Sequence, residues 1–217
     1  MPIINIEKFA QAVEEAKKLA KPRRFKQSVE LIIKLRDVDI RKPENRINTT
    51  VELPHGSGKD AKICVIAQGD LALKAKEVGA DMVLTREDVL KYSSSRRSIR
   101  KLAKTYDFFV AQADLMPLIG RYFGPLLAPR GKMPIPVPPN ADLKPIIERL
   151  RRSVRIRIRN QPQVMCRIGT EDMDSKKIAE NADAVFEALT QKYKIPYNIE
   201  KVYVKLTMGP AVKVDPW

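Results

Sequence analysis

Residues 62–85, KICVIAQGDLALKAKEVGADMVLT, decide the fold of the middle of the chain. The first part, 62–68, is a continuous apolar run, which is typical of a strand buried on both faces. Residues 69–80 show helical spacing, and 81–85 form a second short apolar run. A strand, a helix and a strand at this spacing predict a βαβ unit and therefore a parallel sheet.

The same alternation continues downstream of this unit. A helical segment with a serine break at 86–104 precedes a buried strand at 106–112, and helices follow at 114–123 and 141–152. We therefore expect an inserted, Rossmann-like α/β domain of three layers over residues 60–154.

Both ends of the chain have a different pattern. An amphipathic helix is predicted at 5–20, with Asn5 as its N-cap, and a long helix at 174–193. Alternating apolar residues predict half-buried strands at 28–36, 47–53, 154–160, 164–169 and 201–214, the last kinked at Gly209-Pro210. We expect 1–59 and 155–217 to form one discontinuous α+β sandwich, joined to the insertion by two chain crossings.

The charge balance is strongly basic. The 217 residues include 41 Lys+Arg against 26 Asp+Glu, a net charge of +15, while 44% apolar residues are enough to build real cores. Because summed positive charge attracts phosphate backbones whatever their bases, it predicts a polyanion partner. A membrane surface is the weaker alternative, since no helix pairs a basic face with exposed Trp and Phe.

Neither a membrane span nor a disulfide framework is expected. No apolar stretch approaches the ~18 residues that a span needs, and residues 1–20 lack the apolar core of a signal peptide. Cys64 and Cys166 lie far apart, each inside an apolar run, which favours neither a disulfide nor a cysteine metal site. We expect a reduced, cytoplasmic protein that is monomeric when free.

The sequence contains no complete motif for catalysis or cofactor binding. HGSGKD at 55–60 resembles a phosphate loop, but it has Leu53 in place of the first glycine, Asp60 in place of Ser/Thr, and a strand after it. The turn after Ala67 has a single glycine, so the dinucleotide fingerprint is missing. His55 is the only histidine, which excludes a histidine-based triad or a multi-histidine metal site. We expect no enzyme, no cofactor and no metal.

Basic residues around one aromatic residue suggest contacts with RNA. In the loop 21–27, Arg23, Arg24 and Lys26 would reach phosphates, while Phe25 either stacks on an unpaired base or packs the loop against the core. The chain has only 13 aromatic residues, 6% of the total, so a sheet of base-stacking rings is not expected. Many basic residues and few aromatic rings favour, as the partner, a folded, helical RNA that is recognised by its shape.

Two further features have two interpretations each. Arg155, Arg157 and Arg159 alternate along a strand, where they either follow an RNA backbone or simply face solvent. Thr207-Met208-Gly209-Pro210 ends a strand. It offers a hydroxyl, an adaptable apolar side chain and a close backbone approach, or else it is a plain turn or bulge.

Three stretches carry a family resemblance: LPHGSGK at 53–59, LIGRYFGPLLAPRGKMPIP at 118–136 and LTMGPAVKV at 206–214. They resemble the large-subunit ribosomal protein L-one family, and the similarity runs along essentially the whole chain. The GKMP text and the lack of a bacterial-style N-terminal extension suggest an archaeal-type member. The resemblance implies the two-domain fold described above, with a glycine- and proline-locked basic loop in the insertion.

The resemblance also implies a function. Members are structural components of the large ribosomal subunit that form the mobile stalk at the tRNA exit site, and they are not enzymes. They bind a folded element of large-subunit rRNA mainly through the discontinuous domain, and they repress translation by binding a similar structure in their own mRNA. The implied partners are the rRNA stalk element, the chain's own mRNA and the exit-site tRNA, with no membrane.

The family's contact surface can be carried over by motif. It would comprise residues near three strands: Phe25, Ser28, Met165, Arg167, Gly169, Thr170, Thr207, Met208 and Gly209. At Met165 the sequence departs from bacterial members, whose polar residue supplies a hydrogen bond that methionine does not. Charge and geometry add Lys201 and Lys205 on the last strand. Secondary phosphate contacts are predicted for Arg23, Arg24, Lys26, Arg130, Lys132, Arg155, Arg157 and Arg159.

Two functions of other classes compete with this one. A nucleotide-binding enzyme would hold its ligand at the carboxyl ends of the inserted strands, and the missing glycine fingerprint argues against it. A DNA-binding regulator would rely on the same positive charge, and a preference for duplex DNA over structured RNA would reveal it. Neither alternative explains the three quoted stretches.

Overall fold

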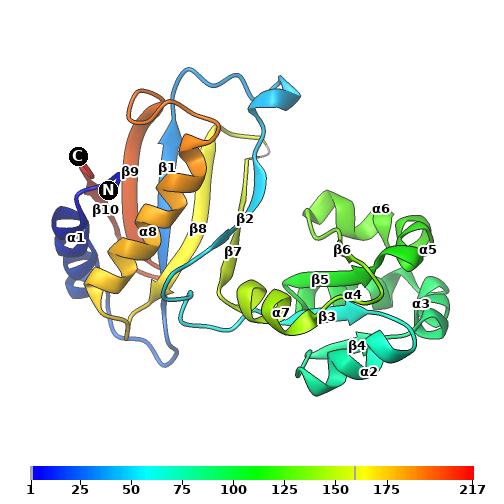
Figure 1. The fold of residues 1–217 in the computed structure, drawn as a ribbon. Coiled ribbons are helices and arrows are strands. Elements are labelled where there is room, and N and C mark those ends of the chain that lie inside the picture. The colour runs from blue at the N-terminus through cyan, green and yellow to red at the C-terminus, as the bar shows by residue number, and fades with distance from the viewer. Residues whose placement is uncertain (1, 159) are drawn as a thin grey trace. The chain divides into compact units, whose positions relative to one another are not determined.

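The computed structural model describes residues 2–158 and 160–217. The chain divides into two compact units (Figure 1): unit 1 consists of Met1–Asp60 with Arg152–Trp217, and unit 2 of Ala61–Arg151. Unit 1 is built from both ends of the chain, and unit 2 is inserted between them. The expected fold class, an antiparallel α+β part and an inserted parallel α/β part, is confirmed.

Unit 1 is built on a four-stranded antiparallel sheet with strand order β10-β9-β1-β8. Its strands are β1 (Ser28–Leu35), β8 (Gln163–Thr170), β9 (Ile199–Leu206) and β10 (Ala211–Val214). Two more strands, β2 (Asn48–Glu52) and β7 (Ser153–Arg157), form an antiparallel pair. Both sheets join strands from opposite ends of the sequence, which is why neither end of the chain could form this unit alone.

Two helices pack against one face of the four-stranded sheet: α1 (Ile6–Leu19) and α8 (Ser175–Thr190) (Figure 1). The predicted cap of α1 is confirmed, because the Asn5 side chain accepts a hydrogen bond of 3.1 Å from the backbone N–H of Lys8. A short 3-10 helix, Pro43–Asn45, precedes β2. Along β1 every second side chain is buried beneath the helices, and the others point away from them.

Unit 2 is built on a four-stranded parallel sheet with strand order β4-β3-β5-β6. Its strands are β3 (Ile63–Ile66), β4 (Met82–Leu84), β5 (Phe108–Gln112) and β6 (Ile135–Val137). Its helices are α2 (Asp70–Glu77), α3 (Arg86–Ser93), α4 (Arg96–Thr105), α5 (Met116–Tyr122), α6 (Gly124–Leu127) and α7 (Leu143–Arg151), with 3-10 turns at Ala113–Leu115 and Ala128–Arg130.

The three layers of unit 2 follow from the alternation along its buried strands. Ile63 and Val65 of β3 belong to a core formed with α2 and α7. Cys64 and Ile66 belong to a second core, on the other face, formed with α3 to α6. Because both faces are covered, the strand is apolar at every position, which is the pattern that predicted it.

The structure differs from the predicted local elements in three places. Residues 201–214 are not one kinked strand but a hairpin, because the turn at 207–210 folds β10 back antiparallel to β9. The serine break divides 86–104 into two helices, and Ser95 caps the second one by accepting a hydrogen bond from the N–H of Ser98 at 3.3 Å. The basic loop at 129–136 is partly regular, because it begins in a 3-10 turn and ends in the edge strand β6.

None of the helices in the described ranges is both long enough and apolar enough to span a membrane. Cys64 and Cys166 are free and buried, and burial raises the pKa of each thiol to about 12. Both thiols therefore stay protonated at neutral pH and are neither nucleophiles nor metal ligands.

Candidate nucleic-acid interface

The side of the unit 1 sheet that faces away from α1 and α8, called the open face below, gathers residues from three strands. Strand register places Ile32 of β1 between Met165 of β8 and Tyr203 of β9. Two charged rows flank this apolar row. One row contains Glu30, Arg167 and Lys205, and the other contains Lys34, Gln163 and Lys201.

This register brings together four of the predicted RNA-contact residues: Met165, Arg167, Lys201 and Lys205. Sequence reasoning missed their neighbours Glu30, Ile32, Lys34 and Tyr203. Alternation along 28–36 already assigned the even-numbered residues to one face, so that pattern was the available signal. What it could not supply was the pairing of β1 with β8 and β9, whose residues are at least 129 positions away in sequence.

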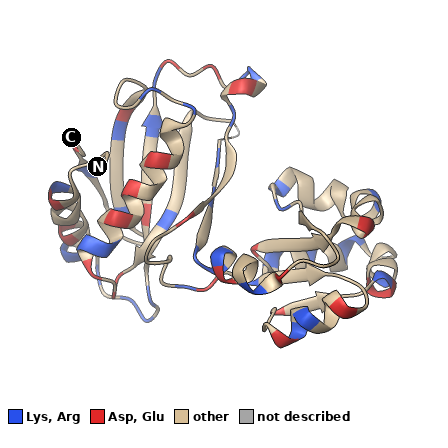
Figure 2. Ribbon diagram, viewed as in Figure 1, with Lys and Arg blue, Asp and Glu red and all other residues tan. Residues whose placement is uncertain are grey.

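The helices on the other side of the sheet carry charges of both signs. In α8, the acidic residues Glu180, Asp183 and Glu187 accompany Lys176 and Lys177 (Figure 2). In α1, three glutamates stand against three lysines. The cations of the open face attract a polyanion to the side that the helices leave uncovered.

One end of the open face is a rim formed by residues 25–28 and 207–209. Thr207 donates its backbone N–H to the carbonyl oxygen of Ser28 at 3.0 Å, and Ser28 donates its N–H to Oγ1 of Thr207 at 3.2 Å. Gly209 closes the turn by donating its N–H to the carbonyl of Leu206 at 2.9 Å. The predicted residues Ser28, Thr207, Met208 and Gly209 therefore lie together.

Gln27 holds this rim together and was not found from the sequence. Its side chain is buried; Nε2 donates to the carbonyl of Lys21 at 3.2 Å, and Oε1 accepts the N–H of Met208 at 3.1 Å. Its backbone exchanges hydrogen bonds with Glu171, one to the carboxylate and one from the backbone N–H, both at 3.0 Å. A polar residue at an inward-facing position of a strand start was the signal, because such a residue must find internal partners.

Three large apolar side chains of the predicted surface are exposed. Phe25, Met165 and Met208 are 51%, 55% and 56% exposed. The alternative in which Phe25 packs the loop against the core is therefore wrong. Exposed large apolar side chains beside cations are available to a partner, and they stand on backbone segments that hydrogen bonds hold in place.

Several predicted cations also have internal partners. The Arg167 guanidinium donates to Oγ of Ser57 at 2.8 Å and to the carbonyl of Lys59 at 3.2 Å. Lys205 donates to the carbonyl of Thr207 at 3.0 Å. Lys26 pairs with Asp172 at 2.5 Å. These cations hold the loops around the open face in place and add positive potential to it.

Gly169 and Thr170 are buried, unlike the other predicted contacts. A Cβ at Gly169 would lie 2.8 Å from Cγ1 of Ile178 in α8, so the helix occupies the space that a side chain would need. The Thr170 side chain is packed against Gly58, whose Cβ would lie 2.5 Å from Oγ1 of Thr170. The glycine at 169 therefore has an internal packing reason, and its predicted RNA contact stays a prediction.

A Gly169→Ala variant tests this reason. We expect it to lower the free energy of unfolding by about 1–3 kcal/mol, because the added methyl group overpacks the contact with Ile178. RNA affinity of the folded variant should stay within about twofold. Urea unfolding and RNA titration below the unfolding transition measure the two effects. A normal stability combined with a tenfold loss of RNA affinity would contradict the packing reason.

The predicted arginine strand lies beside the open face rather than on it. Arg155 and Arg157 belong to β7 and pair with Thr50 and Asn48 of β2. Arg157 nevertheless reaches the edge of the open face. It lines a hollow of about 320 Å³ with Met165 and three amide side chains, Asn160, Gln161 and Gln163. Arg159 lies outside the described residues.

The remaining predicted cations lie in loops of the two units. Arg23 and Arg24 are exposed near Phe25 in unit 1. Arg130 and Lys132 belong to unit 2, where they bind backbone carbonyls: Arg130 donates to Leu126 at 2.9 Å, and Lys132 donates to Tyr106 at 2.6 Å. These two side chains stabilise the loop after α6, and their predicted phosphate contacts stay a prediction.

The groups on the open face are suited to binding. Within the described ranges, no three His, Cys, Asp or Glu side chains come together as metal ligands. Cys166 lies on the helix-covered side of β8, where burial keeps its pKa at about 12. What the surface offers is apolar contact, backbone groups and cations.

Comparison with known proteins identifies the family. The model of the ribosomal protein L1p/L10e family matches residues 10–210, nearly the full chain.

The chain belongs to the ribosomal protein L1p/L10e family.

Similar relatives of this family come from archaea. Each is named a large ribosomal subunit protein uL1. The protein of Thermofilum pendens is 56% identical over 212 residues, which cover 95% of this chain and 94% of the relative. The protein of Methanocaldococcus jannaschii is 54% identical over 209 residues (96% and 95%), and that of Archaeoglobus fulgidus is 53% identical over 213 residues (98% and 99%). The predicted family and its archaeal type are confirmed, as is a ribosomal protein rather than an enzyme.

Proposed function

We propose that the chain is a structural component of the large ribosomal subunit and that unit 1 binds a folded element of large-subunit rRNA through the open face and its rim. In this proposal the bound element and the protein together form the mobile stalk at the tRNA exit site. Family membership and relatives named large-subunit proteins support the assignment to the subunit.

One observation carries the assignment of the site. Phe25 and Met208 are more than half exposed, yet buried Gln27 joins their two segments: its side chain accepts the N–H of Met208 and donates to the carbonyl of Lys21, at the start of the loop that carries Phe25. Large apolar side chains left exposed beside cations mark a candidate interaction site, and here the fold holds their segments in place without covering them. This is the arrangement of a preformed binding surface, which loses little entropy when the partner arrives.

Two kinds of group on this surface have different roles in RNA recognition. The rim offers backbone groups and the apolar side chains of Phe25 and Met208, which suit an irregular RNA structure, while the Thr207 hydroxyl is hydrogen-bonded to Ser28 and fixes the turn. Lys34, Lys201 and Lys205 attract phosphates without reading bases and so set the orientation of the RNA. Shape recognition also fits a chain with few aromatic residues, since base stacking is not its main contact.

The same surface would serve the other RNA partners that the family resemblance implies. A structure in the chain's own mRNA that imitates the rRNA element would compete for the open face, so repression would begin when rRNA is fully occupied. Contact with exit-site tRNA would follow from the position of the stalk. Competition between the two RNA fragments for one site on the protein is the measurable consequence.

A pair of substitutions tests the division between rim and cations. Met208→Ala should lower affinity for an rRNA stalk fragment about tenfold and leave affinity for a random structured RNA of equal length unchanged. Arg157→Gln should weaken the binding of both RNAs to a similar extent. It should also lower the slope of log K against log salt concentration by about 0.9 for the lost phosphate contact. Fluorescence anisotropy titrations at several salt concentrations provide all of these values.

The outcomes separate the proposal from its rivals. Equal losses on both RNAs for Met208→Ala would overturn the assignment of the rim. Tighter binding of the wild-type chain to duplex DNA than to the stalk fragment would favour a DNA-binding regulator. Tight binding of ATP or NAD by the wild-type chain would favour a nucleotide enzyme.

A further inference from the structure

The helix α4 of unit 2 presents a strongly basic face that the proposed function does not use. Five of the ten residues in Arg96–Thr105 are Lys or Arg, and none is acidic. Arg97, Arg100, Lys101 and Lys104 are spaced i, i+3, i+4 and i+7, so they share one side of the helix. All four are exposed. These four residues are called the α4 face below.

The orientation of α4 is set by its other side. Ile99, Leu102 and Ala103 are buried in the core formed with β3 and β5. Rotating the helix to hide its cations would expose these three side chains, so the α4 face is a fixed feature of unit 2. The four cations extend over about 10 Å of helix, comparable to roughly three nucleotide steps along one strand of a duplex.

The α4 face also surrounds a concave surface. A hollow of about 440 Å³ is lined by the four cations and Ser98. Within the described ranges, none of these four side chains forms an ion pair or hydrogen bond with a protein group. This distinguishes them from the cations of the open face, since Arg167 and Lys205 already have internal partners. Four unpaired cations around one hollow are available to a ligand of several negative charges.

The chemistry of the α4 face indicates which polyanion fits. Protein interfaces are centred on apolar or aromatic anchors, and all apolar side chains of α4 point into the core. Guanidinium forks and ammonium groups without such an anchor suit phosphates.

We propose that the α4 face binds the phosphate backbone of a second RNA segment, separate from the RNA held by unit 1. The inference relies on the proposed function only for the RNA that occupies unit 1.

The experiment measures RNA binding to the full chain with the site in unit 1 already filled. The chain is saturated with unlabelled stalk fragment, and a fluorescein-labelled RNA duplex of 20 base pairs and random sequence is titrated against the complex. The α4 variant combines Arg97→Gln, Arg100→Gln, Lys101→Gln and Lys104→Gln. The control variant combines Lys62→Gln, Lys74→Gln, Lys76→Gln and Lys144→Gln, which remove the same charge from the same unit.

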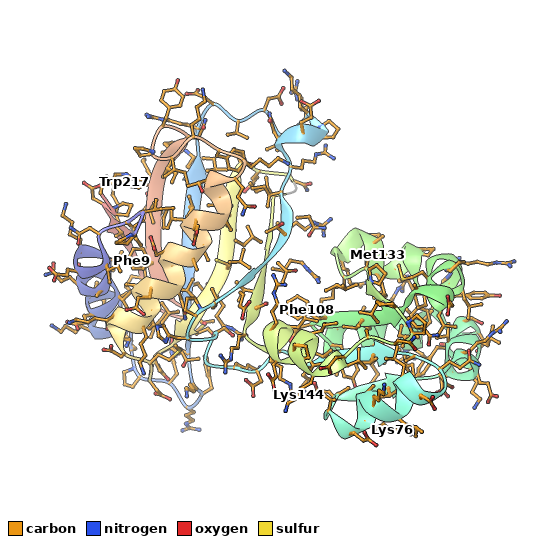
Figure 3. All side chains as sticks on the ribbon, in the orientation of Figure 1. Phe9, Lys76, Phe108, Met133, Lys144 and Trp217 are labelled. Atoms are coloured by element: carbon orange, nitrogen blue, oxygen red, sulfur yellow. The ribbon has the colours of Figure 1, made fainter. Side chains whose placement is uncertain are left out.

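Three of the four control cations lie on the side of the unit 2 sheet opposite α4, and Lys62 precedes β3. Lys76 of α2 and Lys144 of α7 (Figure 3) belong to the helices that cover the opposite side of the unit 2 sheet. All four control lysines are exposed. The two variants therefore differ in where charge is removed and not in how much.

We expect the wild-type complex to bind the duplex with a micromolar Kd. The α4 variant should lose at least about tenfold in affinity, and its salt slope should fall by about 3 as up to four phosphate contacts disappear. The control should lose less than threefold. Equal losses of duplex affinity in the two variants would show that the α4 face contributes only general positive charge, and would overturn the proposal. Equally effective displacement of the duplex by poly-L-glutamate of matched charge would point to an acidic protein instead, and would also overturn the proposal.

The same titrations keep the two proposals apart. Both variants should bind the stalk fragment as tightly as the wild-type chain, because unit 1 is unchanged. If the wild-type chain fails to discriminate the stalk fragment while the α4 variant still loses duplex binding in the free protein, the proposed function is wrong and the α4 face stands. If the wild-type chain binds the stalk fragment specifically and the α4 variant binds the duplex normally, the proposed function stands and the proposal for the α4 face is wrong.

Discussion

Replacing Asn181 by leucine is expected to lower the free energy of unfolding by about 3–5 kcal/mol, because Asn181 is the buried anchor of the loop 54–60. Its Nδ2 donates to the carbonyls of Gly56 at 2.7 Å and Ile168 at 2.8 Å. Its Oδ1 accepts the N–H of His55 at 3.0 Å.

Leucine has a similar volume, so the change leaves packing nearly intact and removes hydrogen bonds. Three backbone groups, one of them buried and two half-buried, would then lose their partner at a side chain that is itself fully buried. Each unsatisfied buried group costs about 1–3 kcal/mol, more than the net value of the bond itself. The loop includes two glycines with positive φ, Gly56 at 65° and Gly58 at 71°, so its path depends on these contacts rather than on local preference.

Urea unfolding followed by Trp217 fluorescence measures this loss. Trp217 is the only tryptophan of the sequence (Figure 3). Its ring packs edge-on against the ring of Phe186 in α8, with 6.1 Å between the ring centroids, so its fluorescence reports on unit 1. Asn160→Leu, at an exposed bend of unit 1, is the matched control and should change stability by no more than about 0.5 kcal/mol. A loss below 1 kcal/mol for Asn181→Leu would show that water or a loop shift satisfies the three groups.

Strand alternation predicted most of the architecture, and it failed where a strand is very short or a turn is tight. The even-odd pattern of 28–36 and the apolar run of 62–68 each specify which faces are buried, so both strands were located. The edge strand Ile135–Val137 was missed because three residues with a central proline give no period. The hairpin at 207–210 was interpreted as a kink because Gly209-Pro210 fits either backbone path.

The candidate site was predictable to the extent that family motifs include it. Those motifs gave Phe25, Ser28 and the 207–209 turn, and hydrogen bonds place Ser28 beside Thr207. Their support could not be predicted, because Gln27 acts through residues that lie 6 and 181 positions away in sequence. The burial of Gly169 under Ile178 likewise depends on how α8 docks, which no local pattern specifies.

Gln27→Leu is expected to lower affinity for the rRNA stalk fragment about 30-fold, equal to about 2 kcal/mol, and to leave binding of random structured RNA within twofold. The substitution removes the hydrogen bonds that join the loop 21–27 to the N–H of Met208. Without them Phe25 and Met208 lose their common support, and ordering both segments again opposes binding. Gln27 is therefore a positioning residue, and Gln191→Leu, at an exposed glutamine, is its control.

A double-mutant cycle separates positioning from a general loss of stability. Met208→Ala alone removes an exposed side chain that would contact RNA in the proposed complex, whereas Gln27→Leu would misplace that side chain. If Gln27 acts through Met208, the double variant should bind the stalk fragment about as weakly as Gln27→Leu alone, with a coupling energy of about 1 kcal/mol or more. Additive losses would show that Gln27 acts elsewhere. Measuring all four proteins below their unfolding transitions, as followed by Trp217, ensures that each affinity belongs to the folded chain. Coupling that appears with the stalk fragment and vanishes with random RNA would tie the buried glutamine to recognition rather than to folding, because only the specific complex needs Phe25 and Met208 in their places.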